Sequence, residues 1–217
     1  MSHRVVELHC IMPIENLPSI YQRGILCHDQ AAAVPHASVA KQEIQDRREK
    51  AVPKGMRLHQ YANLYFCARN PMLYLRQAEH PSLCVIRVNR AVLDLPGVVI
   101  SDQNAASDWV RFHSYPAGMS SINFDYVFAD RWTDPDQRTA WRKKAAKCAE
   151  VLVPGQVPPE YITGFYTCDQ LAQQRVQGVI GPLNWAVSVT VNPHLFSGEL
   201  SDSSSYRRYF FKAMPRP

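Results

Sequence analysis

Apolar runs of strand length recur from one end of this chain to the other, and stretches with helical spacing lie between some of them. Strands of globular proteins commonly hold about five or six residues, close to the length of these runs. The 217 residues contain no internal repeat and no linker, so we expect one domain spanning residues 1–217. The pattern predicts an α+β fold in which the strands cluster and the helices lie at the periphery. The runs occupy residues 5–11, 83–88, 98–100, 150–153, 161–167 and 186–191.

A further predicted strand is followed directly by a helix start in the segment NLYFCARNPMLY. Leu64, Phe66 and Ala68 alternate with residues of the other face, which predicts a half-buried strand. Asn70, which precedes a proline, is typical of a helix N-terminus, whose first backbone N–H groups have no partners within the helix. Such an end can bind phosphate, although most helix starts of this kind bind no ligand. We therefore predict one wall of a nucleotide-binding cleft at this segment.

The formal net charge is +5, and the basic residues are unevenly distributed. They gather around Trp132 and Trp141, in and before a helix that we expect to begin at Asp134. Such a cluster indicates a polyanionic partner. A solvated helix face explains it equally well, because aspartates at the helix start offset part of the charge. The cluster comprises Arg131, Arg138, Arg142, Lys143, Lys144 and Lys147.

The six cysteines show no C-x-x-C spacing, and no histidine pair completes a zinc pattern, so we expect no metal. No uninterrupted apolar run approaches the roughly 20 residues of a membrane span, and the N-terminus lacks the pattern of a signal sequence. We expect a protein of the reducing cytoplasm that does not enter a membrane.

Four segments carry a resemblance through their order and spacing: residues 14–17 with Ile20 and Gly24, residues 44–48, residues 64–67 with 71–74, and residues 132–153. Together they resemble the DarT-type DNA ADP-ribosyltransferases, the toxin half of a toxin–antitoxin pair. No single segment is specific, but their order extends over most of the chain. The amino-acid sequence of residues 12–19 and 63–66 is more similar to the guanosine-modifying branch of that family than to the thymidine-modifying branch.

The resemblance implies an ADP-ribosyltransferase-like core of two small sheets that form an NAD cleft, with peripheral helices. It implies a transfer of ADP-ribose from NAD, the co-substrate, to a base of single-stranded DNA, with guanine favoured over thymine. It also implies a cognate antitoxin that reverses the modification or blocks the cleft.

Carried over position by position, the resemblance makes Glu150 the catalytic glutamate and Arg48 the arginine of the cleft. A carboxylate can hydrogen-bond the ribose and take a proton from the attacking base, and a general base contributes about 10²–10⁴ in rate. A guanidinium offers a planar fork to phosphates and can also orient the base. From residue type alone, Glu150 is better explained as a strand-edge residue paired with Lys147 or Arg142, and Arg48 as a surface residue of a helix.

The other pocket residues follow from the same resemblance. The family often begins with a His-x-Thr-His tract, and the ungapped match puts Cys10 at the first histidine, so either His9 or Cys10 contacts NAD. His28 can reach the adenosine side of the cofactor or be an exposed loop residue. The two tyrosines of the set stack on nicotinamide or fill the core. The remaining members are Asn16, Tyr65, Met72 and Tyr74.

DNA contacts are predicted on two segments. An enzyme that modifies a base needs that base exposed, which favours single strands or a flipped nucleotide. Trp132 is the predicted stacking platform, although a buried tryptophan is equally consistent with the sequence. The predicted phosphate contacts are Arg131, Arg142 and Lys143, and residues 104–123 form a predicted substrate loop with Trp109, Arg111 and His113 as contacts.

Two other functions compete with DNA modification. The same transfer could act on RNA or on a protein side chain, which the charge pattern does not exclude. A non-catalytic nucleic-acid-binding module would derive its affinity from the basic cluster and lose it steeply with salt. A metal-dependent nuclease fits less well, because its carboxylates should cluster and the aspartates here suit a helix start.

Overall fold

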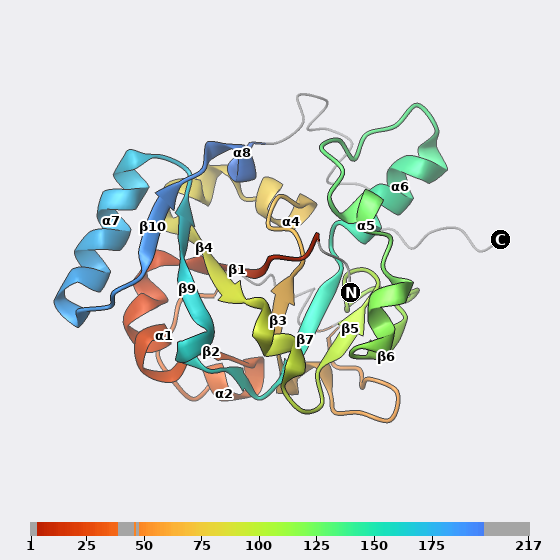
Figure 1. Cartoon of the computed structure of the whole chain (residues 1–217), viewed down its shortest axis with the longest axis horizontal. Helices are drawn as coiled ribbons and strands as arrows, with labels where there is room; N and C mark the ends of the chain where they lie inside the picture. Colours follow the sequence, from red (N-terminus) through yellow and green to blue (C-terminus); the bar gives the residue numbers. More distant parts are fainter. Residues whose placement is uncertain (1–3, 39–45, 47, 198–217) are drawn as a thin grey trace.

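The computed structural model of the chain describes residues 4–38, 46 and 48–197. Its strands form an eight-stranded sheet, in the order β10-β9-β4-β1-β3-β7-β5-β6, and a small sheet that pairs β2 with β8 (Figure 1). The predicted α+β class is confirmed, and the two sheets differ greatly in size. The strands are β1 Glu7–Pro13, β2 Ile25–Leu26, β3 Tyr61–Tyr65, β4 Leu83–Asn89, β5 Val99–Ser101, β6 Phe112–Ser114, β7 Glu150–Pro154, β8 Gln156–Val157, β9 Ile162–Thr167 and β10 Ser188–Val191.

Most helices are short, and they surround the sheet. The α-helices are α1 Leu17–Arg23, α2 His28–Ala31, α4 Pro71–Tyr74, α5 Phe124–Val127, α6 Gln137–Ala146, α7 Gln170–Ile180 and α8 Pro193–Phe196. The 3-10 helices are η1 Ile14–Asn16, η2 Leu58–Gln60, η3 Gln77–Ser82, η4 Arg90–Asp94, η5 Ala117–Ser121, η6 Pro159–Tyr161 and η7 Gly181–Leu183. In Figure 1, α1 and α7 lie beside β9 and β10, whereas α4, α5 and α6 lie at the other side of β1.

The strand predictions agree with the structure to within one residue at each end for β4, β5, β7 and β9, whereas β1 and β10 begin two residues later than expected. The strand predicted through residue 69 instead ends at Tyr65, because the chain then turns. Asn70 Nδ2 donates to the carbonyl of Cys67 at 2.9 Å, and this local bond replaces a sheet bond. Four of the five residues of β3 are buried, so both of its faces are covered, not one.

The expected irregular segment after residue 101 contains β6 and α5, and α7 was not predicted. The sequence also predicts a helix that Ser38 caps and that ends at Arg48, and most of this segment lies outside the described residues.

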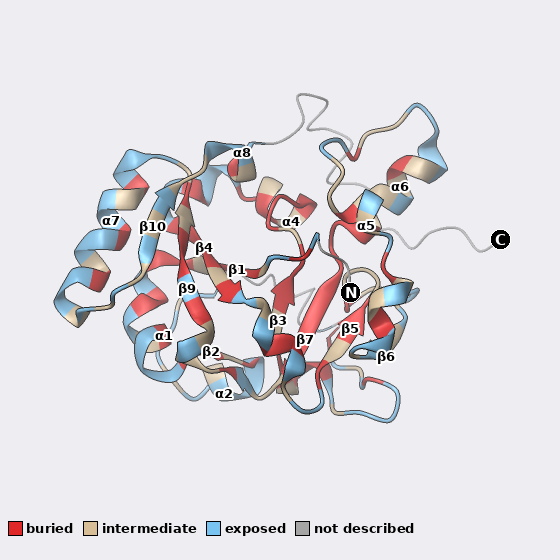
Figure 2. Cartoon of the chain, in the orientation of Figure 1, coloured by how far each residue is buried: buried red, intermediate tan, exposed pale blue. Residues whose placement is uncertain are grey.

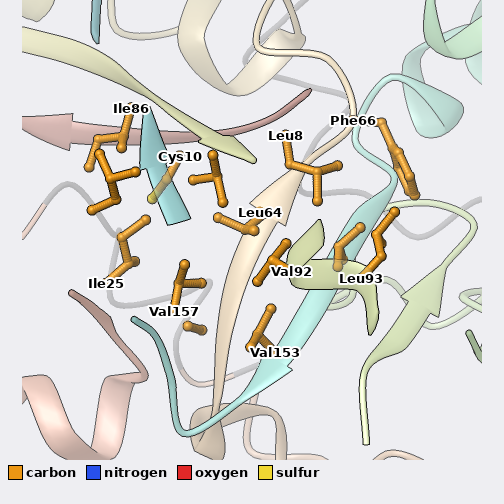
Figure 3. Packing of buried hydrophobic residues seen from close by; sticks show 14 of the residues in the cluster. Leu8, Cys10, Ile25, Leu64, Phe66, Ile86, Val92, Leu93, Val153 and Val157 are labelled. Atoms are coloured by element: carbon orange, nitrogen blue, oxygen red, sulfur yellow. The ribbon is translucent and has the colours of Figure 1, made fainter. Parts of the chain in front are cut away.

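The main core covers one face of the large sheet. Alternate residues of the central strands, including Leu8, Cys10, Leu64 and Ile86, pack there with side chains from α1 and α7. Figure 3 shows Cys10, Leu64 and Ile86 in this cluster, and Figure 2 shows how completely the central strands are buried. The opposite face carries two smaller apolar clusters, one containing Ile11 and Val85 and the other containing Tyr61 and Leu152.

The turn after α1 requires glycine. Gly24 ends the helix with φ +76, a conformation that L side chains rarely adopt. A Cβ at this position would lie 2.0 Å from the carbonyl oxygen of Val157, so the chain passes too closely for any side chain. This turn leads directly into the pairing of β2 with β8.

Candidate active site

The strand register brings five side chains into one row across the second face of the large sheet. Arg87 pairs with His9, His9 with Tyr65, Tyr65 with Glu150, and Glu150 with Ser101. Residues directly opposite each other in antiparallel strands point to the same face. The row therefore gathers polar groups on the face that carries the two smaller apolar clusters, one of which includes Tyr65.

Glu150 is the most deeply buried charge of the row, with 0% of its residue exposed. Arg48 Nη1 and Nη2 each donate to Oε2 at 3.2 Å, and Nη1 also reaches Oε1 at 3.4 Å. The backbone N–H of Ala105 donates to Oε1 at 2.9 Å. The Glu150 N–H donates to Ser101 Oγ at 3.2 Å, which fixes the start of β7. Both carboxylate oxygens thus have donors, as a buried charge requires.

The structure shows which basic residue pairs with the Glu150 carboxylate. The carboxylate pairs with Arg48, and neither Lys147 nor Arg142 contacts it in the described part of the chain. Lys147 is 1% exposed and bonds backbone carbonyls instead, so it does not belong to the exposed basic cluster. The burial of Arg48 also corrects its interpretation as a surface residue.

Strand alternation separates His9 from Cys10. His9 lies in the row with Glu150, its Nε2 is 3.3 Å from Glu7 Oε1, and its buried Nδ1 has no hydrogen-bond partner among the described residues. Cys10 points into the main core on the opposite face, where burial raises the pKa of its thiol to about 12. The assignment of Cys10 to the cofactor pocket is therefore wrong for this structure, because its side chain lies behind the sheet.

The carboxylate of Glu7 contacts three side chains, two of which belong to the row, and the sequence analysis did not predict a role for it. It accepts from Tyr166 Oη at 2.9 Å and from Arg87 Nε at 2.8 Å, besides contacting His9. Burial alone would raise its pKa, but hydrogen bonds from His9, Arg87 and Tyr166 outweigh this and lower the pKa to about 2. The available sequence signal was the spacing of Glu7 and His9, which places both on one face of a strand.

Of the predicted pocket residues on β3 and α4, Tyr65 and Met72 lie near one another, and Tyr74 contacts a different residue. Tyr65 is buried beside Glu150, and burial, followed by the neighbouring carboxylate, raises its pKa well above the ordinary value. Met72 packs against the apolar cluster that contains Tyr65. The half-buried Tyr74 meets Trp132 edge to face at 6.0 Å between ring centroids.

Asn16 and His28 lie on other elements. Asn16 precedes α1 but does not cap it with its side chain; its amide instead accepts from Ala37 N at 2.9 Å and donates to Ala37 O at 2.7 Å. The ring of the exposed His28 lies against the ring of the buried His59, with the centroids 4.4 Å apart and the planes tilted by 39°. Partial burial, followed by the nearby His59, lowers the pKa of His28. His59 was not predicted, since nothing in its local sequence marks it.

The first-turn amides of α4, which we expected to be available for phosphate, are occupied. The side chain of Asn70 accepts from Met72 N at 2.9 Å and from Leu73 N at 3.1 Å. The predicted helix start is thus confirmed, whereas its use for phosphate is not supported.

The predicted DNA contacts of the substrate loop differ in their exposure and in the face of the sheet to which they point. Trp109 is 54% exposed. The exposed Arg111 bonds Asp102 through Nε at 2.8 Å. His113 pairs with Ile100, so it points to the face opposite Glu150 and is not brought to the row.

The basic segment differs from its prediction at Trp132. This residue is 0% exposed, so it cannot serve as a surface platform for a base. Its ring is covered by Arg69 at 5.3 Å and Lys147 at 5.5 Å, which explains the burial. Arg131 and Arg142 are exposed, and Lys143 pairs with Asp134 at 2.8 Å.

Among the described residues, no group of three or more His, Cys, Asp or Glu side chains could hold a metal ion. None of the helices described combines the length and apolar character that crossing a membrane requires. All six cysteines are free thiols.

Comparison with known proteins finds related sequences. The family model of DarT, the ssDNA thymidine ADP-ribosyltransferase, matches residues 9–197. A DNA ADP-ribosyl transferase-DNA ADP-ribosyl glycohydrolase fusion protein of Thermosipho africanus is 31% identical over 206 residues, which is 90% of this chain but only 50% of the relative. A DNA ADP-ribosyl transferase of Thermus sp. is 31% identical over 160 residues, 67% of this chain and 73% of the relative.

Solved structures of both relatives are similar to this chain over most of its length. Thermosipho africanus DarTG in complex with ADP-ribose superposes with a TM-score of 0.74 and 28% identity, covering 88% of this chain and 50% of that one. Thermus sp. 2.9 DarT in complex with ADP-ribosylated ssDNA gives a TM-score of 0.76 with 23% identity, covering 89% and 97%. This chain therefore spans about half the length of the Thermosipho protein.

Proposed function

This chain belongs to the DarT family of DNA ADP-ribosyltransferases, and on that premise we propose that it transfers ADP-ribose from NAD to a base of single-stranded DNA, releasing nicotinamide. The observation that carries this proposal is the buried ion pair of Arg48 and Glu150, in a row of polar groups on the sheet face that also holds two apolar clusters. The names of the Thermus structures, with NAD+ and with ADP-ribosylated ssDNA, support both substrates.

In the proposed reaction the bond between nicotinamide and ribose breaks, and its electron pair leaves with nicotinamide. The ribose carbon becomes cation-like, and a base nitrogen attacks it to form the new bond. Glu150 hydrogen-bonds the ribose and takes the proton that the base nitrogen loses. Because Glu150 has no exposed surface and Arg48 contacts both of its oxygens, Arg48 must move aside or turn toward the substrate when the ribose arrives.

We propose NAD contacts by His9, Asn16, His28, Tyr65, Met72 and Tyr74, with Arg48 as the group that orients phosphates or base. His9 has the strongest support, since its Nδ1 is buried without a partner. The exposed Trp109, Arg111, Arg131 and Arg142 remain the candidate DNA contacts. For Lys143, the pair with Asp134 competes with a phosphate contact.

Two bases are candidate acceptors. The amino-acid sequence of residues 12–19 and 63–66 favours guanine, whereas the name of the matching family model favours thymine. Oligonucleotides that contain only one of these two bases separate the alternatives.

We also propose that residues 1–217 act as one catalytic domain and as a toxin of the reducing cytoplasm. The Thermosipho relative joins a transferase to a DNA ADP-ribosyl glycohydrolase. A comparable glycohydrolase is the antitoxin that we propose for this chain, since it would reverse the modification.

The test compares the native protein with Glu150→Gln, which keeps the shape of the side chain but removes its charge. The control is Glu160→Gln, at an exposed glutamate of η6. Each protein is incubated with NAD and single-stranded DNA, and mass spectrometry locates added ADP-ribose. We expect transfer by the native protein and the control, and a loss of at least about 100-fold in Glu150→Gln.

Full transfer by Glu150→Gln would contradict the assignment of Glu150. Transfer to RNA or protein but not to DNA would change the acceptor. Binding of DNA without any transfer would favour a non-catalytic binding module.

A further inference from the structure

Arg69 and Lys147 are two buried cations with no carboxylate partner among the described residues. Arg69 is 9% exposed and Lys147 is 1% exposed. The described ion pairs include neither residue. A buried positive charge is costly unless an anion or sufficient acceptors compensate it.

Lys147 has its acceptors. Its Nζ donates to the backbone carbonyls of Arg69 and Val127, both at 3.2 Å, and lies 5.5 Å from the ring of Trp132. These contacts tie the turn before α4 to the end of α5. Lys147 therefore contributes positive charge at a fixed place and is satisfied by the protein.

Arg69 has acceptors on one side only. Nη1 donates to the carbonyl of Asp130, and the guanidinium lies 5.3 Å above the ring of Trp132. Nε is buried without a partner, and no described group accepts a bond from Nη2. Nε and Nη2 form one edge of the guanidinium, the edge that presents two parallel N–H donors to an oxyanion. The free donors are thus the pair that suits bidentate binding.

The position of this edge relates it to the active site. Arg69 follows Tyr65 by four residues, and Lys147 precedes Glu150 by three, so both lie where β3 ends and β7 begins. Tyr74, a proposed NAD contact, packs on the same tryptophan as Arg69. Figure 1 shows α4 and α5 close to these strand ends.

We propose that Arg69, held on Trp132 and supported by the charge of Lys147, forms a phosphate-binding site beside the Glu150 row. The ligand is a phosphate oxyanion, either of the NAD diphosphate or of the single-stranded DNA backbone. This site rests on the proposed function for its two ligands. It replaces the amides of α4 as the phosphate contact of this segment, because those amides are capped by Asn70.

The direct test observes the Arg69 Nε–H by ¹H–¹⁵N nuclear magnetic resonance in the native protein. NAD, a mixed-sequence single-stranded oligonucleotide and sodium pyrophosphate are added separately, against sodium chloride of equal ionic strength. A shift of the Arg69 signal with NAD alone identifies the diphosphate as ligand, and a shift with DNA alone identifies the backbone. No shift with either NAD or DNA overturns the proposal, even if pyrophosphate shifts the signal.

Binding to variants gives a second measure. Arg69→Gln should weaken the ligand identified above by about 10- to 150-fold, the range for hydrogen bonds to a charged group. Arg69→Lys should recover part of this loss, since an ammonium keeps the charge but lacks the fork. In the DNA case the salt slope should also fall by about one. The control is Arg23→Gln, at an exposed residue of α1.

Unchanged affinity of a folded Arg69→Gln for both NAD and DNA overturns the proposal. If Arg69→Gln does not fold, the resonance experiment on the native protein decides alone. A shift with NAD or DNA in a protein that transfers no ADP-ribose refutes the proposed function but not this site. Native transfer rates in Arg69→Gln refute the site but not the function.

Discussion

Arg48→Met tests the buried ion pair through stability, independently of substrate. The substitution removes the only side chain that donates to the Glu150 carboxylate in the described part of the chain, leaving Ala105 N as the donor to one oxygen. Removing one partner of a buried pair typically costs about 3–5 kcal/mol, because the other charge stays uncompensated. The contacts of 3.2–3.4 Å are long for charge-assisted bonds, so we expect about 3 kcal/mol.

For a domain of this size each kcal/mol changes the melting temperature by about 2–4 °C, so Arg48→Met should lower it by about 6–12 °C. Urea unfolding monitored by circular dichroism gives the free energy directly. The double variant Arg48→Met with Glu150→Gln carries no charge at the site and should recover a large part of the loss. Arg23→Met, at an exposed arginine, should remain within about 0.5 kcal/mol of the native protein.

A loss below about 1 kcal/mol for Arg48→Met would refute the buried pair. A double variant as unstable as Arg48→Met would also refute it, since the loss would then arise from packing and not from an unpaired charge.

Three further predictions concern other parts of the fold. Glu7→Gln should lower the free energy of unfolding at pH 7 by at most about 3 kcal/mol, and by about half of that after solvent screening. Because the pKa of Glu7 is about 2 in the folded protein against an ordinary 4.5, the difference from the native protein in urea unfolding should vanish as the pH falls from 4.5 to 2. A difference that does not depend on pH would contradict this cause. Gly24→Ala should lose at least about 2 kcal/mol in the same assay, since the residue has a φ of +76 and its Cβ would meet Val157 O at 2.0 Å; a neutral result would contradict this turn. Trp132→Ala should lower the free energy of unfolding by about 3–5 kcal/mol because the ring is buried. Trp109→Ala should change that free energy by no more than about 0.5 kcal/mol but weaken single-stranded DNA binding, measured by fluorescence anisotropy, by about 1–3 kcal/mol. The reverse pattern would support Trp132 as the stacking platform.

Much of the fold could be predicted from local sequence. Apolar runs such as residues 83–88 and 161–167 are strands because their composition suits a buried, pleated surface. The start of α4 was predictable because Asn70 caps it with its own side chain. The end of β3 was not predicted: a bond from Asn70 to Cys67 closes the turn after it, and Lys147 also binds this turn from a distant part of the chain.

The candidate site was predictable as a set of residues but not as an arrangement. The resemblance pointed to Arg48 and Glu150, yet residue type alone favoured Lys147 or Arg142 as the partner of the glutamate. The roles of Glu7 and Arg69 lay outside the prediction. These roles depend on contacts with residues that are remote in sequence, such as Tyr166 for Glu7 and Trp132 for Arg69.

The sequence by itself determined most of the strand runs, the start of α4, the family and the residues that we propose for the chemistry, because each depends on composition and order along the chain. Only the tertiary structure decided that Arg48 meets Glu150 across 102 positions, that His9 and not Cys10 faces the row, and that Trp132 is buried. Strand order and register fix these three outcomes. A face or a partner on a neighbouring strand is set by which residues pair across the sheet, and that pairing is absent from any local pattern.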